Sequence, residues 1–200
     1  MKKKLFALSG LFLVVLVISG LWATKAINLT GTEQTIEPGS TSLANGLSMQ
    51  EMTEKSSLIV TGKCLETKSQ WIDRRLVTLA TVSVTETIKG DSSPELTVVL
   101  PGGVDSNRRF PIAMTYAGAP QIASDEEVFL FLTGQDEVPG AHAVMGFAQG
   151  KYSIGEGEQE KVVTRDLSKV RLQKGMGTVR GNIQAVPLSE FKEKVKSYLR

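Results

Sequence analysis

The chain has 200 residues, of which 41% are hydrophobic and 22% charged, which favours one ordinary globular domain with or without appendages. Its formal net charge is +2, but residues 1–26 carry four of the basic side chains and no acidic ones. The remainder holds 19 basic and 21 acidic groups and, apart from a modest basic cluster at the C-terminal end, lacks the basic face of a nucleic-acid-binding protein. A single cysteine and a single histidine exclude an intramolecular disulfide and a closed structural zinc site.

The N-terminal segment has the pattern of an export signal. Lys2, Lys3 and Lys4 precede an uncharged apolar stretch over residues 5–22. Such a stretch prefers lipid to water, and the positive charges before it favour a cytoplasmic N-terminus, so the rest of the chain is predicted to lie outside the cytoplasm. We interpret residues 1–26 as a signal peptide or as a signal anchor, which leaves the protein secreted or held in the membrane through its apolar stretch.

The next segment separates this signal from the predicted domain. Residues 27–46 are rich in Thr, Ser and Gly and show no sustained hydrophobic period, which is typical of a flexible tether. A single β-rich extracytoplasmic domain is predicted over residues 47–200. It is expected to open with a short helix over residues 47–55, with Ser48 as the N-cap and Glu51 in capping-box position.

From residue 58 onward the pattern changes to short strands separated by turn residues. The clearest strand spans residues 76–88, where apolar residues alternate on one face, and residues 128–132 are apolar on both faces, which predicts a central strand. Further strands are predicted at residues 59–65, 96–100, 142–147, 151–154 and 162–163. Short strands at this spacing favour a barrel or sandwich, and Gly62 inside a strand favours a bulge that curls the sheet.

The C-terminus is predicted to form an amphipathic helix over residues 188–199. Ser189 is its predicted N-cap, and basic residues lie near its end, where they stabilise the helix dipole. One apolar stripe runs along it, made of Leu188, Phe191, Val195, Tyr198 and Leu199.

No catalytic site is predicted. His142 is the only histidine and is expected at a strand edge, and the chain has no Gly-x-Ser-x-Gly elbow. Residues 90–93, Gly-Asp-Ser-Ser, resemble a serine-protease nucleophile loop, but they have the composition of a turn, which is our interpretation.

No metal or cofactor site is predicted either. A calcium site needs only oxygen ligands, for which the candidates are Asp105, Asn107, Asp125, Glu126 and Glu127. None follows an EF-hand pattern, so we interpret them as solvated loop side chains. Residues 102–103, Gly-Gly, would suit an anion-binding nest near Arg108 and Arg109, but a turn with positive φ is the preferred interpretation.

Two other side chains are expected to be structural. Cys64 shares a strand face with Leu58 and Val60, which predicts a small buried hydrophobe, with an intermolecular disulfide as the alternative. Trp71 is expected to cap one end of the core, with ligand stacking as the alternative.

Several short motifs follow one another along the predicted domain. They are Ile-Val-Thr-Gly-Lys at 59–63 followed by Trp71, Ile-Lys-Gly at 88–90, Leu-Pro-Gly-Gly at 100–103, the strand at 129–132, and Gly-x-x-Gln-Gly-Lys-Tyr at 146–152. Their order resembles a widespread set of exported bacterial proteins of uncharacterised activity. The resemblance covers residues 47–155 and implies an architecture rather than an activity.

Residues 58–100, with two strands and a Lys-Gly pair, also resemble the netrin-like domains, which include the tissue inhibitors of metalloproteases. This resemblance implies a small OB-type barrel with flanking helices, so the expected fold is mainly β, with a hydrophobic helix before the barrel and an amphipathic helix after it. The inhibitors chelate zinc through an N-terminal cysteine, whereas the only cysteine here is Cys64, inside a strand.

Three functions remain open from the sequence. The first is a non-catalytic binding or structural module outside the cytoplasmic membrane, with a protein partner in the envelope and no nucleic acid. The second is an inhibitor or partner of an exported protease. The third is an envelope hydrolase with a carboxylate or Ser-Lys site that has no diagnostic spacing.

Overall fold

The structure is a computed structural model that describes residues 42–135, 138–174, 177–180 and 183–200. These residues belong to one unit, Gly39–Arg200. The predicted signal segment with its hydrophobic helix, and the predicted tether up to residue 41, lie outside the described residues. Within the described ranges, neither helix has the length and hydrophobicity that a bilayer span requires.

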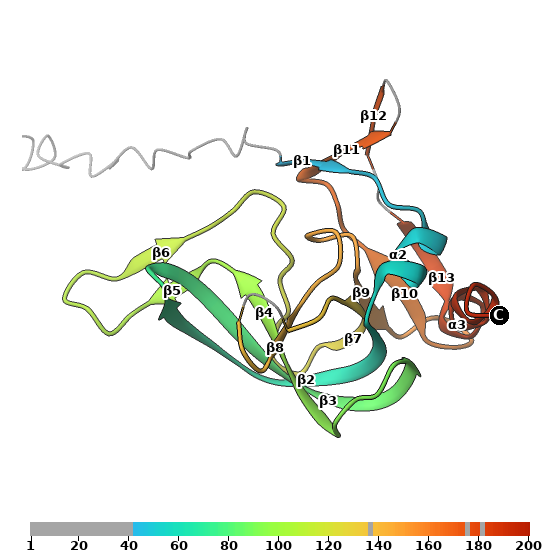
Figure 1. Ribbon diagram of the computed structural model, residues 1–200, viewed down its shortest axis with the longest axis horizontal. Helices are drawn as coiled ribbons and strands as arrows, with labels where there is room; N and C mark the ends of the chain where they lie inside the picture. The colour runs from blue at the N-terminus through green and yellow to red at the C-terminus, as the bar shows by residue number, and fades with distance from the viewer. Residues whose placement is uncertain (1–41, 136–137, 175–176, 181–182) are drawn as a thin grey trace, which may run out of the picture. The chain divides into compact units, whose positions relative to one another are not determined.

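The described part of the chain is mainly β, as expected, and eight strands form one curled sheet (Figure 1). Neighbouring strands are antiparallel except β4 and β8, which are parallel. In spatial order the strands are β13 (Ile183–Pro187), β10 (Val162–Arg165), β9 (Lys151–Gly155), β7 (Glu127–Leu132), β2 (Leu58–Ile72), β3 (Arg75–Lys89), β4 (Glu95–Pro101) and β8 (Ala141–Ala143).

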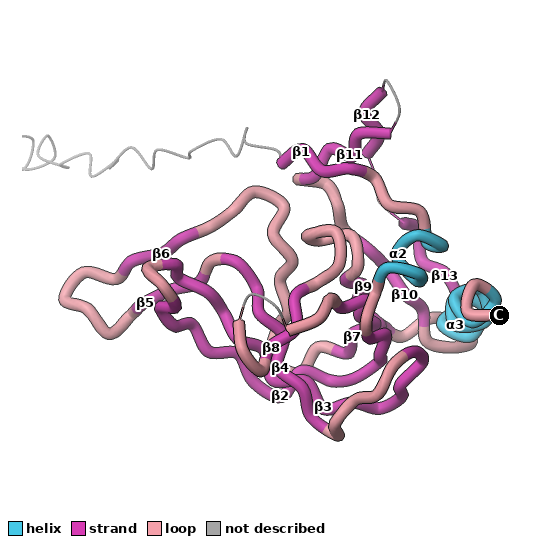
Figure 2. The backbone as a smooth tube through the Cα atoms, viewed as in Figure 1, coloured by secondary structure: helices cyan, strands magenta, loops and turns pink. Residues whose placement is uncertain are grey.

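Smaller elements flank this sheet, as Figure 2 shows. They are a three-stranded sheet of β1 (Ser42–Asn45), β11 (Val170–Lys174) and β12 (Gly177–Arg180), a hairpin of β5 (Gly103–Asp105) and β6 (Ile112–Met114), and helices α2 (Met49–Lys55) and α3 (Leu188–Ser197). Strand β1 falls in the segment predicted to be a tether. It is ordered by parallel pairing with β11, a partner more than 100 residues away that composition does not reveal.

Helix α2 forms as predicted, with the capping box of Ser48 and Glu51 present. Its C-terminal end is held by the Ile-Lys-Gly motif, because Lys89 Nζ donates to the carbonyl oxygens of Thr53 at 2.7 Å and Glu54 at 2.8 Å. Gly90 follows with a φ of +78°, and a Cβ there would lie 2.5 Å from a carbonyl oxygen of the segment after the helix. The motif therefore joins β3 to α2.

The long β2–β3 hairpin confirms the predicted strand at 76–88 and extends the strand predicted at 59–65. Asp73 and Arg74 connect the strands with φ of +46° and +63°, the pattern of a tight two-residue hairpin turn. The pairing register shifts between Thr61 and Gly62, which confirms the predicted bulge. A Cβ on Gly62 would overlap the carbonyl oxygen of Ser83, so the strands approach closely only because this position is glycine.

Strand β7 is buried on both faces, as predicted, and separates two apolar clusters. The first cluster lies on the face of Leu130 and includes Cys64, which is fully buried as predicted. The second lies on the face of Phe129 and Phe131 and includes Phe191 of α3. Alternate residues of one strand thus serve opposite sides of the sheet.

Several predicted boundaries are wrong, among them the end of the C-terminal helix, which is Ser197 instead of residue 199. Helix α3 begins at Leu188 with Pro187 at its N-cap, instead of Ser189, because β13 runs directly into the helix. The strand predicted at 142–147 ends at Ala143, because Gly146 and Phe147 have φ of +63° and +68° and form turns.

Candidate functional site

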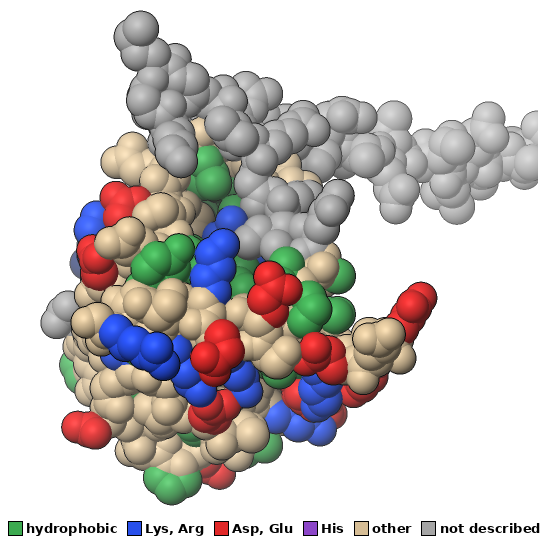
Figure 3. Space-filling model, turned by 90° about the vertical axis from the view of Figure 1, so that its right-hand side faces the viewer, with side chains coloured by type: hydrophobic (Ala, Val, Ile, Leu, Met, Phe, Trp, Pro, Cys, Tyr) green, Lys and Arg blue, Asp and Glu red, His purple; other side chains and the backbone are tan. Residues whose placement is uncertain are grey.

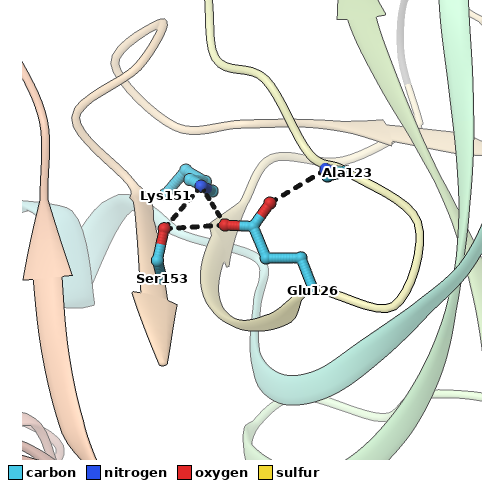
Figure 4. Close-up of polar contacts among 4 residues, drawn as sticks. All are labelled: Ala123, Glu126, Lys151 and Ser153. Carbon is cyan, nitrogen blue, oxygen red and sulfur yellow. Dashed lines mark hydrogen bonds and ion pairs between the residues drawn. The ribbon is translucent and has the colours of Figure 1, made fainter. Parts of the chain in front are cut away.

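A polar cluster of Glu126, Lys151 and Ser153 joins a loop to the central sheet (Figure 4). Lys151 and Ser153 are two residues apart on β9 and therefore share a face. Lys151 Nζ donates to Ser153 Oγ at 2.8 Å and to Glu126 Oε1, and Ser153 Oγ donates to the same oxygen at 2.7 Å. The Ala123 N–H donates to Glu126 Oε2 at 2.9 Å, so both carboxylate oxygens are occupied.

The charges in this cluster favour a structural role over catalysis. Burial by itself would raise the pKa of Glu126, but the hydrogen bonds from Lys151, Ser153 and the Ala123 N–H outweigh it and hold the pKa below its ordinary value. A Ser-Lys hydrolase needs a neutral lysine that accepts the serine proton. Here the Ser153 hydroxyl donates a hydrogen bond to the Glu126 carboxylate, and Lys151 forms an ion pair with the same carboxylate.

We expect Glu126→Gln to lower the free energy of unfolding by about 2 kcal/mol at neutral pH, because it leaves the half-buried Lys151 without its counter-charge. Because the folded pKa of Glu126 lies below its ordinary 4.5, its contribution is complete above that pH and is lost as the pH falls through the folded pKa. Urea unfolding at several pH values measures this: the difference between parent and variant shrinks below about pH 4.5.

The matched control is Asp125→Asn, in which the neighbouring carboxylate loses a charge. Asp125 pairs with Lys63 at 2.7 Å, but its side chain is 84% exposed, so we expect almost no change in the free energy of unfolding. Equal losses in the two variants would contradict the structural role of the cluster.

The calcium candidates are not brought together. Each carboxylate faces its own cation: Asp105 faces Arg108, Asp125 faces Lys63, Glu126 faces Lys151 and Glu127 faces Lys161. Among the residues that the structure describes, no group of three or more His, Cys, Asp or Glu side chains is placed to hold a metal ion. The Asp105 and Glu126 side chains are only 12% and 20% exposed. The prediction that they are solvated loop side chains is therefore wrong for these two.

The other candidates occupy structural positions. His142 lies in β8 with Nδ1 2.8 Å from the carbonyl oxygen of Thr133, so Nδ1 carries the proton. Residues 90–93 link β3 to β4, and their Ser92 hydroxyl lies 2.7 Å from that of Thr87. Gly102 has the predicted positive φ, +89°, but it joins β4 directly to β5 rather than reversing the chain.

An apolar cavity of about 620 Å³ opens beside the β2–β3 turn. Among the lining residues that the structure describes, Arg75 is the one with a charge. A second cavity of about 260 Å³ shares Pro101, Tyr116 and Pro120 with it and is lined by the Leu-Pro-Gly-Gly motif at 100–103. Apolar side chains of the large cavity include Ile72, Leu76, Val99, Val138, Val144 and Phe147.

Large apolar side chains on the β5–β6 hairpin and on the segments next to it are exposed. Trp71 is 39% exposed, Val104 54%, Phe110 76% and Tyr116 44%. The prediction that Trp71 caps the core is therefore wrong. Its indole Nε1 donates to Asp105 Oδ2 at 2.8 Å, which draws the ring onto the hairpin instead.

Sequence reasoning missed the cavities and the hairpin, because β5, β6 and β8 each have only three residues and show no period. The Leu-Pro-Gly-Gly motif was the available signal, since its residues line the smaller cavity. No protein-family model and no curated protein matches the chain. The fold alone therefore defines its class, a mainly β domain built on a curled eight-stranded sheet.

Proposed function

We propose that the chain is a non-catalytic binding module outside the cytoplasmic membrane, and that it takes an apolar ligand into the cavity beside the β2–β3 turn. The cavity volume of about 620 Å³ is the observation that carries the proposal. Binding sites for small ligands have about 300–1,000 Å³ and are mostly apolar, with a few polar groups that orient the ligand. Export through the N-terminal segment is part of the same proposal and rests on the sequence.

The strand connections support the finer proposal of an OB-like, netrin-like barrel. In an OB barrel three strands form a meander, the first also pairs with the fourth, and the third lies beside the fifth. Strands β2, β3 and β4 form such a meander, β2 pairs with β7, and β4 pairs in parallel with β8. An isolated bridge between Leu132 and Val144 links β7 to the residue after β8, which brings the sheet toward closure.

If the sheet is an OB-like barrel, the position of the cavity is that of an OB ligand site. Its lining includes Ile72 and Arg75 at the turn between the first two barrel strands, and Thr133 and Val138 from the loop between the last two. OB domains that bind nucleic acid combine a basic groove with stacking aromatic side chains. The lining residues that the structure describes are mostly apolar, which favours an apolar ligand.

The two alternative functions have weaker support. Cys64 is fully buried, so it offers no thiol to a protease zinc by the route that the netrin-like inhibitors use. The hydrolase alternative would need a neutral lysine at Ser153, whereas Lys151 is paired with a carboxylate.

Titration of the full chain with an environment-sensitive apolar dye such as phenylnaphthylamine tests the proposal. We expect Ala143→Phe, which places a ring into the cavity from β8, to weaken dye binding about tenfold, since about 60 Å² of lost apolar contact costs about 1.5 kcal/mol. The matched control is Ala113→Phe on the exposed part of β6, outside the cavity lining.

Dye that binds the apolar stretch at residues 5–22 contributes equally to both variants and cancels in the comparison. Thermal unfolding of each variant confirms that it is folded. If Ala143→Phe and Ala113→Phe bind the dye as the parent does, the cavity is not a binding site and the proposal fails.

A further inference from the structure

The β5–β6 hairpin presents an exposed phenylalanine at its tip. Its loop, residues 106–111, projects from the curled sheet on the side away from α2 and α3 (Figures 1 and 2). Phe110 in this loop is 76% exposed, and Val104 at the base of the hairpin is 54% exposed. Side chains of this size usually reduce their exposure by packing, and the neighbouring core leaves these two in water.

Hydrogen bonds hold the hairpin in place. Asp105 Oδ1 accepts from the Asn107 N–H at 3.2 Å, and its Oδ2 accepts from Trp71 and Arg108, each at 2.8 Å. The bond from Trp71, together with those from Arg108 and the Asn107 N–H, keeps the pKa of Asp105 below its ordinary value. Phe110 is thus presented by an organised loop.

The base of the hairpin is also tied to the sheet. The Val104 N–H donates to Ser69 Oγ on β2 at 3.1 Å. Gly103 lies very close to strands β2 and β3, because a Cβ there would be 2.5 Å from Ser69 Oγ on β2 and 2.7 Å from Thr78 Oγ1 on β3. These contacts hold the base of the hairpin in one position on the sheet, and its tip projects from there.

The charge of the tip is positive. Arg108 and Arg109 directly precede Phe110, and the guanidinium carbon of Arg109 lies 5.7 Å from the centre of its ring. Asp105 is the one acidic residue of residues 103–114, and Arg108 compensates it. The opposite face, around α3, mixes basic and acidic side chains (Figure 3). Lys192 of α3 forms an ion pair with Glu86.

We propose that this hairpin tip docks the domain on an anionic lipid surface, with Phe110 at the boundary between headgroups and acyl chains and Arg109 at the lipid phosphates. Aromatic and apolar side chains beside basic ones are the composition of segments that bind at membrane interfaces. Each cation near an anionic surface contributes about a fivefold factor in binding, and the ring adds its apolar area.

The size and shape of the tip favour lipid over a protein partner. A stable protein interface buries about 800 Å² on each side. The Arg109 and Phe110 side chains of this projecting loop supply only a small fraction of that area. A membrane contact of this size is weak by itself. It becomes effective if the chain is already tethered, and the predicted anchor at residues 5–22 would supply that tether.

The test uses the full chain with an environment-sensitive fluorophore on Ser106→Cys at the tip. Cys64 is fully buried, so labelling of the parent gives the background. The labelled chain is reconstituted in vesicles of phosphatidylcholine, with and without phosphatidylglycerol, and spin-labelled lipids report the depth of the fluorophore. The matched control carries the label on Glu158→Cys, in the exposed β9–β10 turn.

On anionic vesicles we expect the tip label to be quenched by lipid and the control label to stay in water. Arg109→Gln should reduce the membrane-inserted fraction relative to the aqueous fraction about fivefold, and high salt should act in the same direction. Phe110→Ser should abolish insertion without unfolding the domain, because the ring is exposed.

Three results would overturn the proposal. The tip label stays in water on anionic vesicles, or its insertion is the same with Phe110→Ser. Alternatively, it becomes shielded without vesicles in a manner that depends on protein concentration, which would indicate a second copy of the chain as the partner.

Discussion

Replacing Phe191 with alanine is expected to lower the free energy of unfolding by about 3–5 kcal/mol, the usual cost of emptying a buried phenylalanine site. The ring is 2% exposed, and its centre lies 4.9 Å from that of Phe129 and 4.7 Å from that of Tyr152. These contacts fix α3 against the curled sheet, so the loss includes the docking of the helix. Urea unfolding followed by circular dichroism measures the change.

The controls separate this packing from general sensitivity of the helix. Phe191→Leu keeps most of the buried volume and should lose about 1–1.5 kcal/mol. Leu199→Ala, two residues after the end of α3, removes a side chain that is 39% exposed and should change the stability by less than about 0.5 kcal/mol. A loss below about 1 kcal/mol for Phe191→Ala would mean that α3 contributes little to the fold.

Gln149→Leu is the second substitution with a large expected effect, about 2–4 kcal/mol of stability. Gln149 is 1% exposed, yet every polar atom of its amide has a partner. Its Oε1 accepts from the Leu47 N–H at 2.8 Å, and its Nε2 donates to the carbonyl oxygens of Asn45 at 2.8 Å and Gly146 at 3.1 Å. Leucine fills the space but leaves these backbone groups without their partner.

The midpoint temperature of thermal unfolding should fall by about 4–16 °C, because each kcal/mol of lost stability lowers it by about 2–4 °C in a domain of this size. Hydrogen exchange at the Leu47 amide should accelerate selectively, because Gln149 fastens the segment that enters the domain. Gln159→Leu, in an exposed turn, is the matched control and should change neither the midpoint temperature nor the exchange rate at Leu47. Unchanged exchange at Leu47 in Gln149→Leu would contradict this role.

The same reasoning explains the whole Gly-x-x-Gln-Gly-Lys-Tyr motif as structural. A Cβ on Gly150 would lie 2.8 Å from the Phe131 carbonyl oxygen. Tyr152 is buried in the aromatic cluster, its hydroxyl accepts from Arg165 Nη1 at 2.9 Å, and burial raises its pKa to about 12. Together with Gln149 and Lys151, these residues connect β9 to the loop, the core and the entering chain, so the motif has a structural role in the described domain.

Local signals in the sequence were sufficient for some elements. The capping box of Ser48 and Glu51 fixed the start of α2, alternation fixed β3, and continuous apolar character fixed β7 as a central strand. The apolar stripe on α3 was correct at Phe191 and Val195, both buried. Each of these depends on residues within about four positions of one another, which is the range over which periodicity and capping act.

The sequence by itself therefore determined the β-rich class, the flanking helices of the described domain and the burial of Cys64. Only the tertiary structure decided which strands pair, and so where function can lie. The pairing of β1 with β11, the cluster of Glu126 with Lys151, and the cavity all join residues 25 or more positions apart. Such contacts depend on the register and curl of the whole sheet, which a bulge shifts by one residue and which no local period records.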